Sequence, residues 1–288
     1  MNKSNETTRA AILNCLTEGM SVRATARVTG ASRGLVLRIL VAAGEFCEGY
    51  SYFRFRNLNT TRVEADEQWS YIGAKQRNAT QPGHGDVWTF CAIDSDSKLV
   101  FSWLVGARTP ENCDEFMADV AGRLKNRIQL STDGHQMYIR AVRQAFGFAR
   151  CDYARIVKSY GQDGEQGPER RYSPMVCTGV TKERMIGRPD MELVSTSYVE
   201  RLNLDMRMNN RRFTRLGNGF SRSAKNHGAS IALAFFSHNF IKAHRTLSKA
   251  AGAKTTPAMA AGIATRPWTV ADIVARMDGE TCQIGMAA

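Results

Sequence analysis

Three acidic residues stand where carboxylates from separate elements can converge on one point. Asp66 lies in VEADEQWSYIG, Asp133 ends IQLSTD, and Glu200 lies in TSYVERLNL. Phosphodiester cleavage by two metals needs such carboxylates around ions about 3.5–4 Å apart, and magnesium prefers oxygen ligands. We therefore predict that Asp66, Asp133 and Glu200 are catalytic and bind two divalent metal ions, magnesium or manganese.

Each of these acids also has an ordinary structural explanation. An aspartate at a strand end commonly belongs to a turn or a helix cap, and a glutamate in the first turn of a helix suits the helix dipole. Asp94 and Asp96 are rival candidates, but the sequence DSDS is typical of a hairpin turn. The hypothesis therefore depends on elements that bring the three acids together.

The chain from residue 61 onward predicts such elements. Three antiparallel strands followed by helix, strand, helix and strand are the order of a ribonuclease-H-like fold. We expect an α/β domain with a mixed five-stranded sheet and flanking helices, in which the first and fourth strands are neighbours and Asp66 lies beside Asp133. The predicted strands are 62–69, 87–93, 99–105, 128–132 and 154–157, and the predicted helices are 110–126 and the segment from Asp133 to Phe146.

The second half of the chain has a weaker pattern. Residues 159–195 are rich in Gly, Pro and charge and predict an insertion or loop. A helix from about Ser195 to Gly217 and another over 223–244 should close the catalytic domain, which we place at 61–247. The tail, 248–288, predicts one short helix, Thr269–Met277.

Basic residues follow the proposed metal site along the first of these helices. Asn203, Arg207 and Arg211 continue the spacing of Glu200 by three, seven and eleven positions, and Ser197–Leu247 holds nine Lys and Arg against two acids. Such a cationic row can bind DNA phosphates beside the metal ions. The predicted DNA-binding residues are Arg33, Arg38, Asn203, Arg207, Arg211, Arg212 and Arg215.

Residues 1–45 predict a small all-α helix-turn-helix domain, with three short helices over 8–44. Ser21 and Ser32 suit the N-caps of the second and third helices, and Arg33 then stands at the start of a recognition helix for the major groove. Any three-helix bundle shares this pattern. Residues 46–60 are interpreted as a connector.

Composition limits the class of protein. The formal charge of +12 makes a polyanion the expected partner, and nucleic acid suits it better than a membrane surface. No run approaches the ~18 apolar residues of a spanning helix. Seven scattered cysteines indicate free thiols rather than a zinc site. We expect a cytoplasmic, nucleoid-associated protein.

Several segments together resemble the bacterial insertion-sequence-one-type transposases, a branch of the DDE superfamily, over about residues 8–260. They are ADEQWSYIGAKQRN, DVWTFCAIDSDSKLVFSWLVGART, LSTDGH, STSYVERLNLDMRMNNRRFTRL and HNFIKAHRTL. The resemblance implies that Asp66, Asp133 and Glu200 hold two divalent metals and that Asn203 assists. The N-terminal zinc-binding Cys motif that many members carry is absent from this sequence.

The resulting functional prediction is a DNA transposase that binds transposon ends and performs metal-dependent cleavage and strand transfer. It would act on double-stranded DNA, both ends and target, as a homodimer or larger assembly. Two alternatives stay open: a DNA-binding repressor or inactive transposase remnant, and a ribonuclease-H-like nuclease that cleaves without joining.

Overall fold

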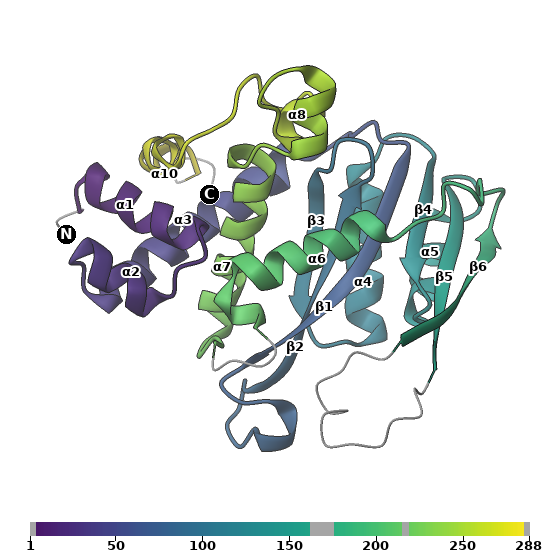
Figure 1. The fold of residues 1–288 in the computed structure, drawn as a ribbon, viewed down its shortest axis with the longest axis horizontal. Coiled ribbons are helices and arrows are strands. Elements are labelled where there is room, and N and C mark those ends of the chain that lie inside the picture. The colour runs from purple at the N-terminus through teal and green to yellow at the C-terminus, as the bar shows by residue number, and fades with distance from the viewer. Residues whose placement is uncertain (1–3, 162–175, 215–218, 285–288) are drawn as a thin grey trace.

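A six-stranded sheet lies at the centre of the computed structural model, which describes residues 4–161, 176–214 and 219–284 (Figure 1). The sheet exceeds the predicted five strands because part of the segment 159–195, predicted as an insertion, pairs with the fifth strand. This sixth strand is polar and mostly exposed at the sheet edge, so its sequence carries no alternating apolar pattern. The strands are β1 (Arg62–Ile72), β2 (Gly85–Asp94), β3 (Val100–Gly106), β4 (Ile128–Asp133), β5 (Cys151–Gly161) and β6 (Val176–Ile186).

The strand order is β3-β2-β1-β4-β5-β6. β1 pairs antiparallel with β2 and parallel with β4, β4 pairs parallel with β5, and β6 runs antiparallel to β5. The predicted mixed α/β architecture is therefore confirmed, as is the prediction that the first and fourth strands are neighbours.

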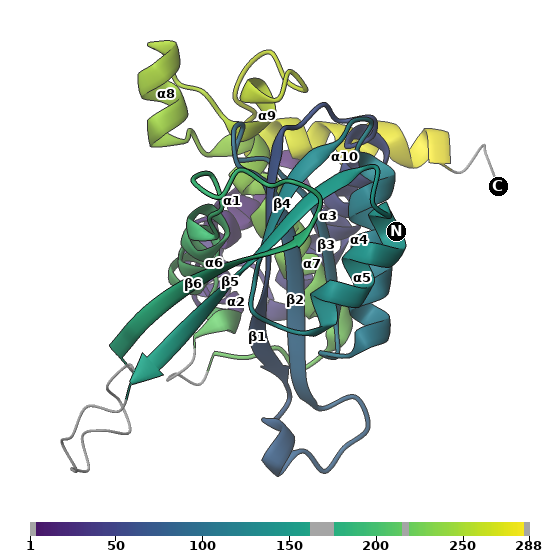
Figure 2. The same cartoon turned by 90° about the vertical axis from the view of Figure 1, so that its right-hand side faces the viewer.

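Helices cover both faces of the sheet (Figure 2). On one face lie α4 (Pro110–Arg123) and α5 (Met137–Phe146), and on the other lie α6 (Ser197–Asn209) and α7 (Ala224–Phe236). Successive side chains of a strand point to opposite faces. Val63 and Ala65 of β1 accordingly join the hydrophobic cluster of α4 and α5, whereas Glu64 contacts the start of α6.

The N-terminal helices begin where the sequence predicts. They are α1 (Glu6–Thr17), α2 (Val22–Thr29) and α3 (Arg33–Arg54). Ser21 and Ser32 are the N-caps of α2 and α3, and their hydroxyls accept hydrogen bonds from Ala24 N and Leu35 N at 3.1 and 3.2 Å. The segment 46–60, predicted as a connector, is helical for most of its length, because α3 continues without a break to Arg54.

This continuation anchors the N-terminal helices to the rest of the protein. α3 packs closely against α7, where Gly44 lies so near Ala229 that a Cβ on Gly44 would stand 2.4 Å from the Ala229 Cα. Further along α3, the Tyr50 ring contacts Phe236, Phe240 and Trp268 with centroids 5.3–5.7 Å apart. One hydrophobic cluster therefore runs from α1 to the sheet.

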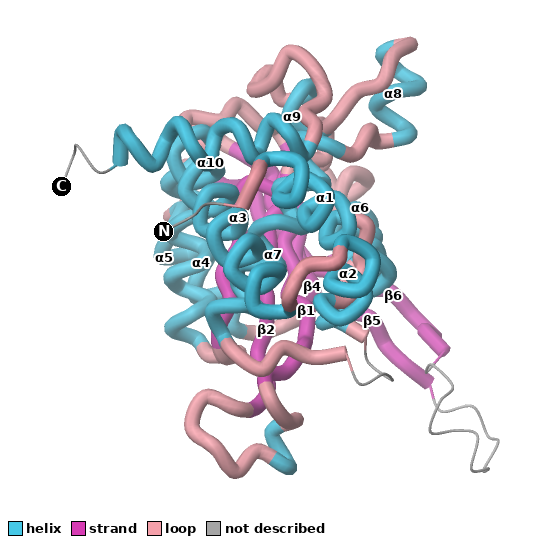
Figure 3. Tube along the Cα trace, turned by 90° about the vertical axis from the view of Figure 1, so that its left-hand side faces the viewer, coloured by secondary structure: helices cyan, strands magenta, loops and turns pink. Residues whose placement is uncertain are grey.

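The C-terminal segment holds more helix than predicted. α7 passes into one π-helical turn, Ser237–Ile241, followed by α8 (Arg245–Ala251), α9 (Pro257–Ala260) and α10 (Val270–Ile284). α10 lies beside α1 and α3 (Figure 3), and Arg9 of α1 forms an ion pair with Asp278 of α10. Within the described residues, none of the helices is both long and apolar enough to cross a bilayer.

Candidate metal-binding active site

Asp66 and Asp133 lie side by side at the end of the parallel pairing between β1 and β4. Ala65 is aligned with Thr132, and each aspartate follows its aligned residue by one position. Aligned residues of parallel strands face the same side, so both carboxylates face α6. The structure thus brings these two predicted ligands together.

Glu67 supplies a third carboxylate that the sequence analysis did not select. One carboxylate oxygen from each of Asp66, Glu67 and Asp133 lies within 4.8 Å of the others, a spacing that can hold a metal ion. Strand alternation sends the Glu67 side chain toward α5, where its Oε2 accepts a 2.7 Å hydrogen bond from Tyr138 and its Oε1 accepts a 2.8 Å bond from Arg108 Nε. The sequence indicated Glu67 only by its position next to Asp66. Because neighbouring side chains of a strand point to opposite faces, that position argued against a shared site.

Burial and mutual repulsion destabilise the charged form of these acids. Burial, followed by the charges of Glu67 and Asp133, raises the pKa of Asp66 to about 7. Burial and the Glu67 charge raise the pKa of Asp133, although the His135 N–H, which donates to Asp133 Oδ1 at 3.1 Å, opposes that shift. A divalent cation would relieve this repulsion, and carboxylate oxygens are the donors that Mg²⁺ and Mn²⁺ favour. The residues present therefore fit such a metal.

Glu200 lies on the same face but outside the three-carboxylate cluster. It accepts hydrogen bonds from Lys158 Nζ of β5 and from Thr196 Oγ1, the latter at 2.6 Å. Its charge nevertheless contributes to the raised pKa of Asp66. The third predicted ligand is thus near the pair, but Lys158 holds its carboxylate.

Glu64 fixes the start of the helix that carries Glu200. Its carboxylate, 2% exposed as a residue, accepts hydrogen bonds from the backbone N–H groups of Tyr198 and Val199 at 2.8 and 3.0 Å. A carboxylate at a helix N-terminus satisfies unpaired N–H groups and complements the helix dipole. β1 therefore supplies both an aspartate of the cluster and the cap of α6.

Asn203 lies one turn after Glu200 and contacts the cluster directly. Its Nδ2 donates a 2.7 Å hydrogen bond to Asp66 Oδ2, and its backbone carbonyl accepts a 2.9 Å bond from Gln68. The residue is 4% exposed. Asn203 was predicted to bind DNA beside the metal site; in the structure its side chain is buried against Asp66.

Comparison with known protein families bears directly on this region. Residues 60–160 match the family of IS1 transposases. The predicted resemblance is confirmed over residues 60–160, which contain Asp66, Glu67 and Asp133. None of the curated proteins compared matches the chain.

Two similar solved structures share little sequence identity with this chain. One is "Crystal structure of a pre-cleavage Mos1 transpososome", at 12% identity and a TM-score of 0.24, covering 53% of this chain and 60% of that chain. Another is an Argonaute from Aquifex aeolicus, at 9% identity and a TM-score of 0.28, covering 62% of this chain and 28% of that chain. This chain spans less than two thirds of each, and these scores support no conclusion by themselves.

The predicted cationic row along the helix that carries Glu200 is shorter than expected. α6 ends at Asn209 rather than near Gly217, and Asn210 begins a separate 3₁₀ turn, Arg211–Phe213. Arg207 is therefore the last of the periodic positions on the helix. Arg211 is exposed, whereas Arg212 turns inward and bonds Ser230 at 3.1 Å. Arg215 lies outside the described residues.

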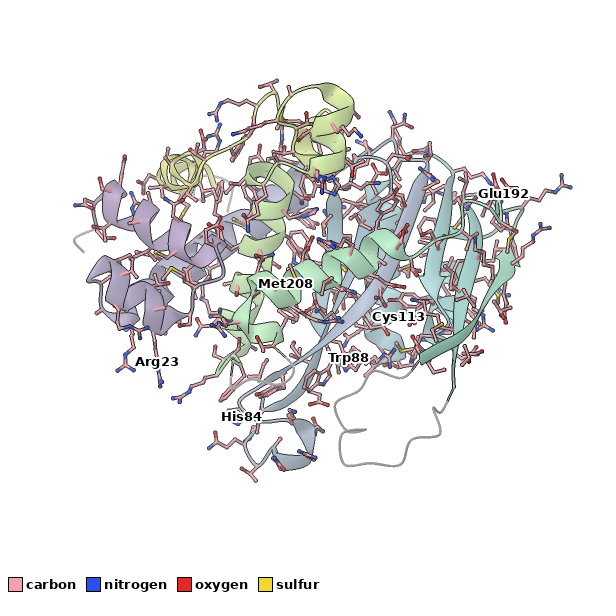
Figure 4. The ribbon with its side chains drawn as sticks, in the orientation of Figure 1. Arg23, His84, Trp88, Cys113, Glu192 and Met208 are labelled. Atoms are coloured by element: carbon pink, nitrogen blue, oxygen red, sulfur yellow. The ribbon has the colours of Figure 1, made fainter. Side chains whose placement is uncertain are left out.

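The predicted recognition helix presents Arg33 and Arg38 to solvent. Arg23 and Arg27 of α2 are exposed as well, and Figure 4 shows Arg23 extending outward from α2. These four arginines give the N-terminal helices a basic surface.

Proposed function

We propose that this chain is a DNA transposase of the DDE type, with a ribonuclease-H-like catalytic domain and an N-terminal helix-turn-helix that binds the transposon ends. The observation that carries the proposal is the pair Asp66 and Asp133 at adjacent strand ends, inside the segment that matches the IS1 transposase family. A pure DNA-binding repressor has no use for a desolvated carboxylate cluster of this kind.

Asp66 and Asp133 would hold two divalent metal ions, with Glu200 as the third catalytic ligand. The ions would supply an activated nucleophile and charge stabilisation for in-line attack at phosphorus. Asn203 keeps the Asp66 carboxylate oriented, and Arg108 with Tyr138 fixes Glu67 beneath the pair. Lys158 pairs with Glu200 beside the pair, so Glu200 would have to leave Lys158 to bind a metal ion.

DNA would be held by the exposed arginines of α2 and α3 and by Arg207 and Arg211. Two ends must be joined to one target, so the active form is a homodimer or larger assembly. Phosphate contacts of this kind position the duplex without reading its sequence.

A strand-transfer assay with the element's own ends, a supercoiled target and Mg²⁺ or Mn²⁺ tests the proposal. Asp133→Ala and Glu200→Ala should abolish cleavage and joining while preserving end binding. Asp96→Asn is the matched control, since Asp96 belongs to the β2–β3 turn and pairs with Arg62. Joining that persists in Asp133→Ala protein would refute the assignment. Cleavage without joined products would favour the nuclease instead.

A further inference from the structure

A cavity of about 320 Å³ lies where the N-terminal helices meet the catalytic unit. Its walls come from the α1–α2 turn, the outer face of α6, the 3₁₀ turn after it, and the end of α7. Gly19 of the α1–α2 turn comes so close to Asn209 at the end of α6 that a Cβ there would stand 2.6 Å from the Asn209 carbonyl oxygen. The volume is in the range of small-molecule sites, which begins at about 300 Å³.

The charged residues that line this cavity are almost all cationic. Asp205 is the single acid among the lining residues, and it already faces Arg201 at 3.4 Å. Excess positive charge around a concave site favours an anionic ligand. The cationic lining residues are Arg201, Arg211, Arg212, Lys242 and Arg245.

Among the lining residues, Arg212 most clearly lacks a negatively charged partner in the described part of the chain. Burial lowers the pKa of its guanidinium to about 10, and among the described residues no carboxylate forms an ion pair with it. Its Nη1 donates to Ser230 Oγ at 3.1 Å, while its Nε has no hydrogen-bond partner in the described part of the chain. Arg212 as a whole is half-buried, and removing a cation from water without a counter-charge is costly.

Two more polar atoms of the lining share this condition. Ser237 Oγ and His244 Nδ1 are buried, and no described residue forms a hydrogen bond with them. Buried polar groups normally have partners. A ligand with several acceptor oxygens can supply partners to groups of this kind, such as the serine hydroxyl and the guanidinium N–H.

We propose that this cavity binds the phosphate group of a nucleotide, with Arg212 as its anchor. Arginine suits phosphate because its planar fork matches two oxygens at once. Leu16, Met20 and Leu202 add an apolar wall for the sugar and base. The choice of a nucleotide among anions rests on the proposed function, whereas the phosphate site does not.

The test is isothermal titration of the full chain with deoxyadenosine 5′-monophosphate, with deoxyadenosine as the uncharged probe. Only the monophosphate should bind. Arg212→Met should weaken that binding at least tenfold, and Lys242→Gln should weaken it about threefold. Lys249→Gln is the matched control, because Lys249 is an exposed lysine of α8 outside the cavity, and its binding should equal the wild type.

Three outcomes would overturn the proposal: no binding of the monophosphate, equal binding of deoxyadenosine, or wild-type affinity in Arg212→Met protein with an unchanged thermal transition. If Arg212→Met does not fold, wild-type affinity in Lys242→Gln protein would overturn it equally. Asp133→Ala should bind the monophosphate normally, so failure of the catalytic assignment is visible separately.

A competition arm identifies the source of the phosphate. Loss of binding to a fluorescent DNA duplex at saturating monophosphate would assign the cavity to a nucleotide of the DNA strand. Undisturbed duplex binding would assign it to a free nucleotide. Both results require the phosphate site.

Discussion

Asn203 Nδ2 on α6 lies 2.7 Å from Asp66 Oδ2 on β1, and Asn203 is buried. An amide N–H donated to a carboxylate favours its charged, metal-binding form, at a residue whose pKa burial raises to about 7. The same contact ties the helix that carries Glu200 to the strand that carries Asp66.

Asn203→Ala should weaken metal binding at Asp66. Loss of a hydrogen bond to a charged group costs about 1.5–3 kcal/mol, so the metal concentration for half-maximal joining should rise about tenfold or more. The defect should be larger at pH 6 than at pH 8, since protons compete with the metal for Asp66. Met208→Ala, on a position of the same helix that is 65% exposed and outside the cavity, should behave as wild type. An Asn203→Ala protein with unchanged metal dependence at both pH values would refute this role.

The Lys158–Glu200 ion pair should matter for metal affinity and little for stability. The two side chains are 32% and 42% exposed, and exposed pairs contribute about 0–1 kcal/mol. Urea unfolding of Lys158→Met should therefore differ from wild type by less than about 1 kcal/mol. Because Glu200 must leave Lys158 to reach the metal, Lys158→Met should need up to about fivefold less metal for joining. A higher metal requirement would show that Lys158 assists catalysis instead.

His227 should make the fold sensitive to mild acid. It is fully buried between Ser70 and Ser221, at 3.0 and 2.9 Å, and burial followed by the Arg212 charge lowers its pKa from 6.5 to about 4. The pKa of His227 is lower in the folded than in the unfolded protein. The neutral, buried histidine therefore contributes its full stability above pH 6.5, and this contribution is lost as the pH falls toward 4. The loss at pH 4.5 should be about 2–3 kcal/mol. Urea unfolding at pH 7 and 4.5 should show a smaller decrease for His227→Gln than for wild type; equal decreases would contradict the assignment.

Two glycines of α3 should respond oppositely to alanine. Gly44→Ala places a methyl against the α7 backbone at Ala229, and overpacking of this kind costs about 1–3 kcal/mol. Gly49→Ala meets nothing within 4 Å and should stabilise by about 0.5–1 kcal/mol through helix propensity. Thermal unfolding of both variants measures the difference. A Gly44→Ala protein as stable as Gly49→Ala would mean that α3 does not pack tightly on α7 in solution.

Local sequence patterns predicted much of the fold. Serine caps located α2 and α3, and the change to short apolar strands located β1 to β5 and the adjacency of Asp66 and Asp133. The extension of α3 to Arg54 was not predicted, because it depends on tertiary contacts: Phe236, Phe240 and Trp268, far along the chain, surround Tyr50.

The candidate site was also predictable only in part, because tertiary contacts position some of its residues. A strand-end aspartate is visible in sequence, but Glu67 required knowledge that Tyr138 and Arg108 hold its carboxylate near the pair. The inward turn of Arg212 depends on where α6 ends, and Asn210, whose side chain bonds Ser230 and Arg212 N, sets that end. The periodicity of a single helix does not predict where that helix ends or how Arg212 is oriented.

Because α3 is one unbroken helix, it fixes the distance between its two ends. Its 22 residues span about 33 Å, the length of roughly ten base pairs of duplex, and its far end is clamped against α7. If the N-terminal helices bind the transposon end as proposed, α3 sets a distance. That distance separates the DNA sequence they recognise from the phosphodiester that is cut. The cleavage position would then be measured by the protein in base pairs from its binding site, without any base at the cut itself being read.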